Sequence, residues 1–162
     1  MFQLYVFLCF LASLQSRASI IGPVSDLVVA NGIVSPDGFT RSAVLAGGTQ
    51  PGPTIVAQKG DTFKINVTNQ LTDDSMLTST SIHWHGLFQH HSNQMDGVSS
   101  VQYCDGLRGP LIIYNPNDPY SSWYDIDDES SIITLMDWYN LPSPLVQRQL
   151  IADSVLINGV GR

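Results

Sequence analysis

The sequence is poor in charge and has no cluster of one sign that could bind nucleic acid. Asp, Glu, Lys and Arg make up 13% of its 162 residues, about half the usual share. No run of Lys or Arg is present, so binding to nucleic acid has no electrostatic basis. The 14 acidic and 7 basic residues give a net charge of -7, which we interpret as a solubilising surface. Because 43% of the residues are hydrophobic, a packed core is expected and intrinsic disorder is not.

Long apolar runs are also scarce, since the single candidate lies at the N-terminus over residues 5–14. This run is too short to span a bilayer, which takes roughly 20 residues. The small residues Ser16, Ala18 and Ser19 follow it, as cleavage by signal peptidase requires. A buried strand or helix is the alternative. We expect a signal peptide over residues 1–19, no membrane span, and a secreted, extracellular product.

Cysteine is nearly absent, which matters more in a secreted chain than in a cytosolic one. Cys9 leaves with the expected signal peptide, and Cys104 is then the one cysteine remaining. A lone thiol in an oxidising compartment indicates a missing partner, although a buried free cysteine is the alternative. Asn66 begins the triplet Asn-Val-Thr, an acceptor for N-glycosylation that also agrees with export.

Glycine and proline punctuate the chain into short segments typical of an all-β protein. The 13 Gly and 9 Pro separate apolar runs at spacings near ten residues, which indicates a β-sandwich or barrel. Within residues 61–68 the side chains alternate, so Asn66 is expected on the wet face and Val67 on the buried face. A short helix is possible within residues 141–153. The expected strands are residues 26–34, 40–45, 61–68, 79–86, 111–114, 131–138 and 154–157.

The triplet His83-Trp84-His85 carries the chemistry of the sequence. On a strand, residues i and i+2 point the same way, so the two imidazoles would share a face with their Cα atoms roughly 6.5–7 Å apart. Two such rings can serve two neighbouring metal ions or one, and imidazole suits Cu, Zn, Fe and Ni. A chance surface pair is the alternative. The other two histidines, His90 and His91, are adjacent and are expected in a loop.

The surroundings of this triplet resemble a known family. Residues 79–86 are similar to the first copper motif of the multicopper oxidases. Other segments narrow the resemblance to the fungal laccases, and together they cover nearly the whole mature chain. These segments are residues 21–24 (IGPV), 36–39 (PDGF), 51–53 (PGP), 102–110 (QYCDGLRGP), 115–119 (NPNDP) and 156–162 (LINGVGR).

The resemblance implies a cupredoxin-like (plastocyanin-like) Greek-key β-sandwich over residues 20–153, with residues 154–162 opening a second cupredoxin domain. It implies copper as the cofactor of a three-domain enzyme that oxidises phenols and reduces O2 to water. The phenolic substrate and O2 would then be partners of a longer product. No nucleic-acid or membrane partner is expected.

The resemblance also implies roles for individual residues. His83 would ligate the type 2 copper, and His85 would ligate one copper of the type 3 pair. Asp96 falls where the family has a carboxylate near the copper cluster, with a role in proton delivery or water orientation. A turn former before Gly97 is the plainer interpretation of Asp96, and the two are compatible. Cys104 would form a disulfide with a cysteine of the second domain.

The sequence also departs from the family pattern. Between Asp-Gly and Gln-Tyr-Cys the family has a few tens of residues, which include a second His-x-His pair, a cysteine and two strands. Here residues 98–101 alone connect Gly97 to Gln102. We therefore expect an incomplete sandwich with one of the family's four His-x-His pairs, and no oxidase turnover by this chain alone. A non-catalytic copper-binding module and a non-functional gene remnant are the alternatives.

Overall fold

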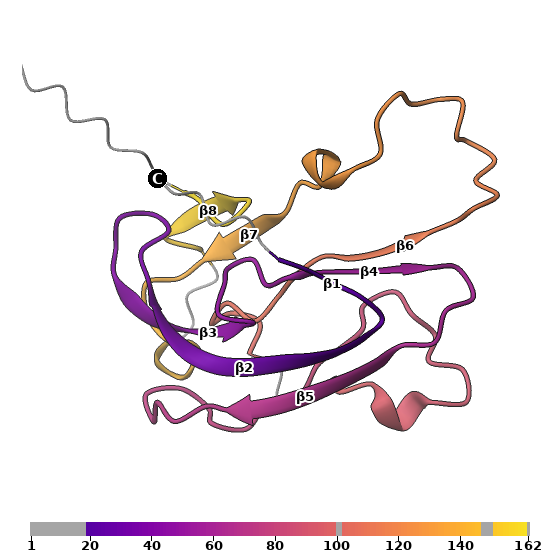
Figure 1. Cartoon of the computed structure of the whole chain (residues 1–162). Coiled ribbons are helices and arrows are strands. Elements are labelled where there is room, and N and C mark those ends of the chain that lie inside the picture. Colours follow the sequence, from indigo (N-terminus) through magenta and orange to yellow (C-terminus); the bar gives the residue numbers. More distant parts are fainter. Residues whose placement is uncertain (1–18, 100–101, 147–150, 162) are drawn as a thin grey trace, which may run out of the picture.

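The computed structural model describes residues 19–99, 102–146 and 151–161, and it is built from short strands (Figure 1). The predicted signal segment lies outside these ranges except for Ser19. The strands are β1 (Ile20–Ile21), β2 (Val24–Val34), β3 (Arg41–Ala46), β4 (Thr54–Gln58), β5 (Lys64–Gln70), β6 (Leu111–Tyr114), β7 (Leu135–Trp138) and β8 (Ser154–Ile157). The helical elements of the described residues are single 3-10 turns at Asn93–Met95 (η1), Glu129–Ser131 (η2) and Ser143–Leu145 (η3). The predicted all-β fold is confirmed.

The strands form two three-stranded sheets and one hairpin-like pair. One sheet has the order β1-β4-β6 with parallel pairing, and the second has the order β3-β2-β5. Strand β2 pairs antiparallel with β3, from Val29 opposite Ala46 to Val34 opposite Arg41, and parallel with β5. Strands β7 and β8 form the third, antiparallel ladder.

Strand β3 is the centre of the molecule because both of its faces are buried. Val44 and Ala46 belong to one apolar cluster, together with Leu27 and Val29 of β2. Ala43 and Leu45 point the other way, as period-2 alternation requires. They join a second cluster completed by residues of β7 and β8, namely Met136, Trp138 and Leu156. The chain segments that carry the candidate site pack against the first cluster, through Ile82 and Leu107.

Most of the predicted strands are present, and the prediction for residues 79–86 is wrong. Residues 79–84 form no strand, and residues 85 and 86 lie in a turn. A strand needs a neighbouring backbone, and within the described residues one backbone bond joins this segment to a distant part of the chain, from Gly97 N to Ile82 O at 2.9 Å. The short strands β1 and β4 were not expected. The helix expected within residues 141–153 is reduced to the 3-10 turn η3, with residues 147–150 outside the described ranges.

Strand β5 begins three residues later and ends two residues later than expected, but Asn66 is on the exposed face as predicted. Asn66 is exposed, and its side chain donates to Asp26 Oδ1 at 2.8 Å. Val67, expected to be buried, is 38% exposed because β5 is the edge strand of its sheet. Among the described residues, no helix has the length and apolar character needed to cross a bilayer.

Candidate functional site

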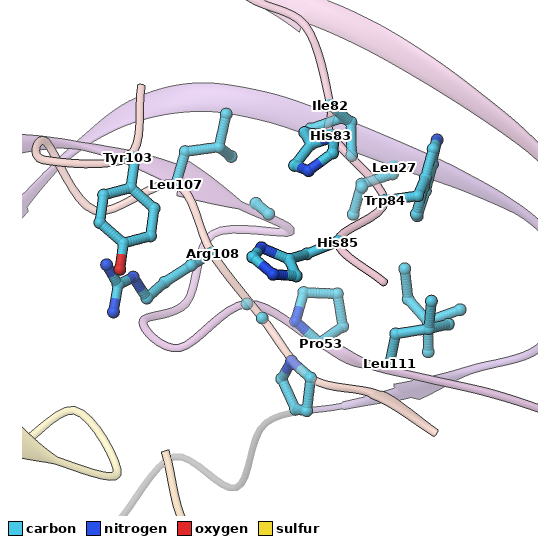
Figure 2. A pocket seen from close by; sticks show the side chains of 15 residues that line it. Leu27, Pro53, Ile82, His83, Trp84, His85, Tyr103, Leu107, Arg108 and Leu111 are labelled. Carbon is cyan, nitrogen blue, oxygen red and sulfur yellow. The ribbon is translucent and has the colours of Figure 1, made fainter. Parts of the chain in front are cut away.

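The two histidines of the His-Trp-His triplet lie side by side although they are not on a strand. The centroids of the His83 and His85 rings are 5.5 Å apart, and the rings are tilted by 58°. Figure 2 shows both rings directed toward one cavity, with Trp84 extending away from them. The predicted juxtaposition of the imidazoles is therefore present, although residues 82–84 belong to no strand and His85 lies in a turn.

Asp96 fixes the first of these rings. Its Oδ1 lies 2.8 Å from His83 Nδ1 and also accepts from Trp84 N at 3.1 Å. The side chains of His83 and Asp96 are 36% and 18% exposed. The hydrogen bond from the Trp84 amide, followed by that from His83, lowers the pKa of Asp96 below its usual value. With Nδ1 engaged, the His83 nitrogen left for a metal is Nε2.

The close approach of the Asp96 segment to the histidine segment depends on a glycine. A Cβ on Gly97 would stand 2.4 Å from Ser81 Cβ and 3.0 Å from Ile82 O. Because no side chain is there, Gly97 N reaches Ile82 O and Ser81 Oγ donates to Gly97 O at 2.8 Å. Trp84 Nε1 adds a bond to Met95 O at 3.3 Å. These contacts tie η1 and residues 95–97 to the histidine segment.

A turn follows the triplet directly. Leu87 N donates to Trp84 O at 3.1 Å, with His85 and Gly86 at the central positions. Gly86 has φ +87°, a conformation that glycine adopts at no steric cost. This turn, which was not predicted from the sequence, sets the direction of the chain immediately after His85.

The histidine pair borders a half-open, mainly apolar cavity of about 370 Å³. Its walls come from β2, β4, residues 82–85 and residues 103–111 (Figure 2). Tyr103 and Arg108 form one end, where the guanidinium carbon lies 3.7 Å from the centroid of the tyrosine ring. Arg108 Nη1 also donates to Leu135 O at 3.1 Å. Neither residue was singled out from the sequence, because their proximity to the histidines arises only from the fold.

The donor set suits copper chemically but is small. Imidazole nitrogen is a favoured ligand of copper, and a carboxylate bound to the second nitrogen of a ligating histidine is a common supporting group. Within the described ranges, however, no group of three or more His, Cys, Asp or Glu side chains could hold a metal ion together. The residues present can therefore supply two nitrogen ligands, which is part of a copper site.

The remaining candidate residues lie away from this pair. His90 and His91 are in a loop, as predicted, with ring centroids 3.8 Å apart. Cys104 is an exposed free thiol, so the alternative of a buried cysteine is wrong. Its predicted disulfide stays a prediction, as does glycosylation of Asn66.

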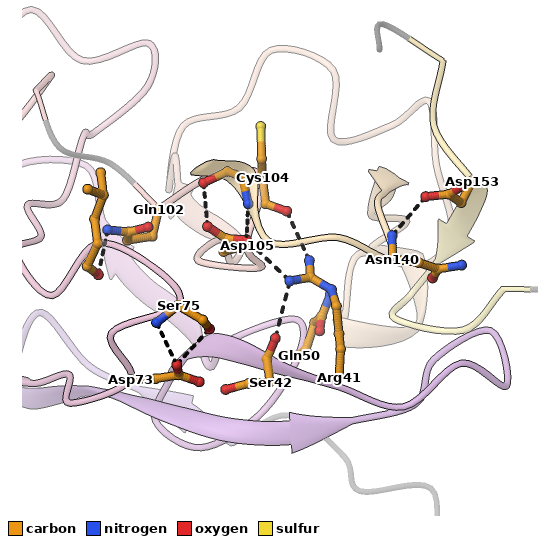
Figure 3. A network of polar contacts seen from close by, with 12 residues as sticks. Arg41, Ser42, Gln50, Asp73, Ser75, Gln102, Cys104, Asp105, Asn140 and Asp153 are labelled. Atoms are coloured by element: carbon orange, nitrogen blue, oxygen red, sulfur yellow. Dashed lines mark hydrogen bonds and ion pairs between the residues drawn. The ribbon is translucent and has the colours of Figure 1, made fainter. Parts of the chain in front are cut away.

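A buried polar network behind the cavity was not predicted. Asp105 is fully buried and accepts from Arg41 Nη1 at 3.2 Å and from Ser143 Oγ at 2.5 Å (Figure 3). Arg41 also stacks over Trp138, with its guanidinium carbon 4.0 Å from the ring centroid. Burial lowers the pKa of Arg41 more than its bond to Asp105 raises it. The sequence contains no signal for the pairing of Arg41 with Asp105, because the two residues lie 64 positions apart.

Comparison with known proteins identifies the family. Residues 28–105 match the family model described as multicopper oxidase. Laccase-3 of Trametes villosa is 46% identical over 187 positions, covering 96% of this chain and 39% of that protein. The laccase of Pycnoporus cinnabarinus is 47% identical, covering 88% of this chain and 34% of that protein. The chain thus spans less than two fifths of the length of these relatives.

Solved structures agree with the sequence matches. The crystal structure of the laccase from Botrytis aclada is 31% identical, with a TM-score of 0.67 over 88% of this chain and 32% of that one. The multicopper oxidase Fet3p, at 24% identity and a TM-score of 0.68 over 88% of this chain and 33% of that one, shares the fold. The predicted cupredoxin-like fold is confirmed, and the chain belongs to the multicopper oxidase family, with fungal laccases among its relatives.

Proposed function

We propose that this chain supplies one His-x-His pair to the copper cluster of a laccase-type multicopper oxidase. In this proposal His83 ligates the type 2 copper and His85 ligates one copper of the type 3 pair. The observation that carries the proposal is the 5.5 Å separation of the two ring centroids on the wall of one cavity. Two imidazoles at this spacing can each bind one of two neighbouring ions.

Asp96 supports the same proposal through its contact with His83. Its carboxylate bonds to Nδ1, which orients the ring and leaves Nε2 available. The second oxygen of the carboxylate makes no hydrogen bond within the described residues, so it is available to a water molecule. We infer that Asp96 both orients His83 and holds a water or a proton near the metal. Copper, when bound, supplies the one-electron redox chemistry.

The activity belongs to a longer product in this proposal. Phenol oxidation coupled to reduction of O2 to water needs further ligands and an entry site for electrons, and the candidate site provides two imidazoles, with no group of three or more ligands among the described residues. The alignment with laccase-3 of Trametes villosa spans 187 positions, more than the 162 residues here. That difference supports the expectation of a missing internal segment, which we place between Gly97 and Gln102.

The remaining assignments complete the proposal. Residues 1–19 would direct secretion, residues 20–153 would be the first cupredoxin domain, and residues 154–162 would open the second. The exposure of Cys104 and of Asn66 supports a disulfide to a further domain and a glycan. Both modifications need an accessible side chain, and both side chains meet that requirement.

Titration of the purified chain with Cu(II), followed by electron paramagnetic resonance, tests the assignment of the ligands. We expect one weak site whose spectrum shows coupling to nitrogen, and we expect its loss in a His83→Ala, His85→Ala variant. The matched control is His90→Ala, His91→Ala, which removes two exposed loop imidazoles and should leave the site intact. Unchanged binding in the first variant, or loss in the second, would contradict the assignment.

Oxygen uptake in the presence of catechol tests the statement about activity. We expect no turnover by the 162-residue chain, with or without added copper. Turnover that scales with the concentration of this chain would show that the proposed need for further ligands is wrong.

A further inference from the structure

The segment that leads to the histidine pair is held by side chains where a strand would use backbone groups. Three successive carbonyls, those of Leu77, Thr78 and Ser79, accept hydrogen bonds from side-chain amides. Gln102 Nε2 donates to the first and the third, each at 3.0 Å, and Asn69 Nδ2 donates to the second at 2.9 Å. The donors thus alternate from one carbonyl to the next, as they do along a strand that lies between two neighbouring strands.

The two amides differ in their surroundings. Gln102 is 2% exposed, whereas Asn69 is exposed on β5. Water can take the place of an exposed donor such as Asn69, but it does not readily fill the position of a donor that is itself buried, so loss of the Gln102 amide leaves two carbonyls without this partner. Gln102 is therefore the stronger of the two constraints on the segment.

Gln102 is itself rigidly placed. Its main-chain carbonyl accepts from Asp105 N at 3.2 Å and from Leu107 N at 3.0 Å, which closes the turn of residues 102–107. That turn is fixed to β3 by the bond from Val44 N to Asp105 O at 2.9 Å and by the buried ion pair with Arg41 (Figure 3). A continuous path of contacts thus joins the centre of the sheet to residues 77–79, four residues before His83.

We propose that Gln102 is a positioning residue for the histidine pair, because its buried amide takes the place of a neighbouring strand for residues 77–79. The inference rests on the proposed function in that the pair is taken to bind copper. Gln102 touches neither histidine, and it acts through the backbone that carries them. A glutamine is suited to this task because one NH2 group can donate to two carbonyls at once.

Two substitutions separate the hydrogen-bonding role of the Gln102 amide from the effect of the size of its side chain. Gln102→Met keeps the length and removes both N–H donors, and Gln102→Glu keeps the shape but places an oxygen opposite two carbonyl oxygens. We expect each to weaken Cu(II) binding about tenfold, the lower end for groups that support metal ligands. Asn69→Ala should change the affinity less than twofold, because water replaces its exposed bond.

A control variant tests whether a loss of stability alone lowers the affinity for Cu(II). Leu156→Val trims the second apolar cluster, whose members do not include residues 77–79. It should lower the melting temperature without changing Cu(II) affinity, measured at a temperature where both variants remain folded. Equal affinities in the native protein and folded Gln102→Met, or an equal loss in Leu156→Val, would overturn the proposal.

Hydrogen exchange gives a readout that needs no metal. The Trp84 amide is bonded to Asp96 Oδ1 and the Gly97 amide to Ile82 O, and we expect both to exchange faster in Gln102→Met than in Leu156→Val. If the native chain binds no copper, the proposed function fails while this measurement still decides the role of Gln102. Unchanged protection of both amides would reject the positioning role.

Discussion

At the scale of single residues, one carboxylate organises the candidate site. Asp96 bonds both the ring of His83 and the backbone of Trp84, and these bonds lower its pKa. A group whose pKa is lowered in the folded state stabilises that state above its unfolded pKa, about 3.9 for Asp. The contribution is lost as the pH falls through the lower folded value. The contact should therefore be complete at neutral pH and disappear only in acid.

Titration of the Trp84 amide tests this contact. We expect its NMR chemical shift to move below about pH 4, as Asp96 gains a proton. Asp96→Asn should abolish that step, because an amide does not titrate in this range. The amide of Val29, in the fully buried core, serves as the control for unfolding. A step that survives in Asp96→Asn would assign the titration to another group.

The sequence predicted which residues belong to the site better than it predicted how they are held. His83, His85 and Asp96 were identified from a motif, and they do lie together. The use of Asp96 to hold a backbone amide was not predictable, because it compensates for an absent strand. The requirement for glycine at position 97 was likewise not predictable, because it comes from the contact with Ser81, which lies 16 residues earlier in the sequence.

Substitution of Gly97 tests that steric requirement. Gly97→Ala would place a Cβ 2.4 Å from Ser81 Cβ, and we expect a loss of about 1–3 kcal/mol of unfolding free energy, typical of overpacking. Adding Ser81→Gly should recover part of this loss, because it removes the clashing atom. Gly22→Ala is the control, since a Cβ there meets nothing within 4 Å. Denaturant unfolding compares the native protein with Gly97→Ala, Ser81→Gly, the double variant and Gly22→Ala. Additive losses in the double variant would contradict the steric account.

At the scale of elements, the turn of residues 102–107 links three parts of the fold. It holds β3 through Asp105, η3 through Ser143, and the segment before the histidines through Gln102. Hydrophobic patterning located β2, β3, β6, β7 and β8 because each has its ladder partner. The same patterning failed for residues 79–86, where the apolar residues are present but none of the described strands pairs with them. A strand forms only beside a second strand, and the residue pattern of one segment does not show whether that second strand exists.

Removing the charge of Asp105 tests the strength of this link. Asp105→Asn leaves the Arg41 guanidinium buried without its counter-charge, and losing one partner of a buried pair costs about 3–5 kcal/mol. Because this is a large share of a typical domain's stability, Ser143→Ala provides a milder companion, with an expected loss of about 1 kcal/mol for one hydrogen bond. Urea unfolding followed by tryptophan fluorescence measures both. Asp125→Asn, at an exposed site, is the control and should leave the free energy of unfolding unchanged. If Asp105→Asn loses no more unfolding free energy than Ser143→Ala, the ion pair contributes little.

At the scale of the whole molecule, more large apolar side chains of the described residues are exposed than buried. Phe88 is fully exposed and Val98 is 70% exposed, and both flank the candidate site. The cavity beside the histidines is mainly apolar, and β5 is an edge strand. Exposed apolar surface and unpaired strand edges favour association. These features have a common explanation if a segment that would cover them is missing between Gly97 and Gln102.

Restoring those residues is the test of that explanation. The insert would be the residues of laccase-3 of Trametes villosa that align between Gly97 and Gln102 of this chain, placed after Gly97. We expect the extended chain to bind less of the dye ANS and to melt at a higher temperature, because apolar surface is covered. We also expect tighter Cu(II) binding, because the resemblance places a second His-x-His pair in that segment. A Gly/Ser insert of equal length is the control and should improve none of the three. If the laccase segment performs no better than this control, the exposed surface has another origin, and the internal deletion does not explain the incomplete donor set.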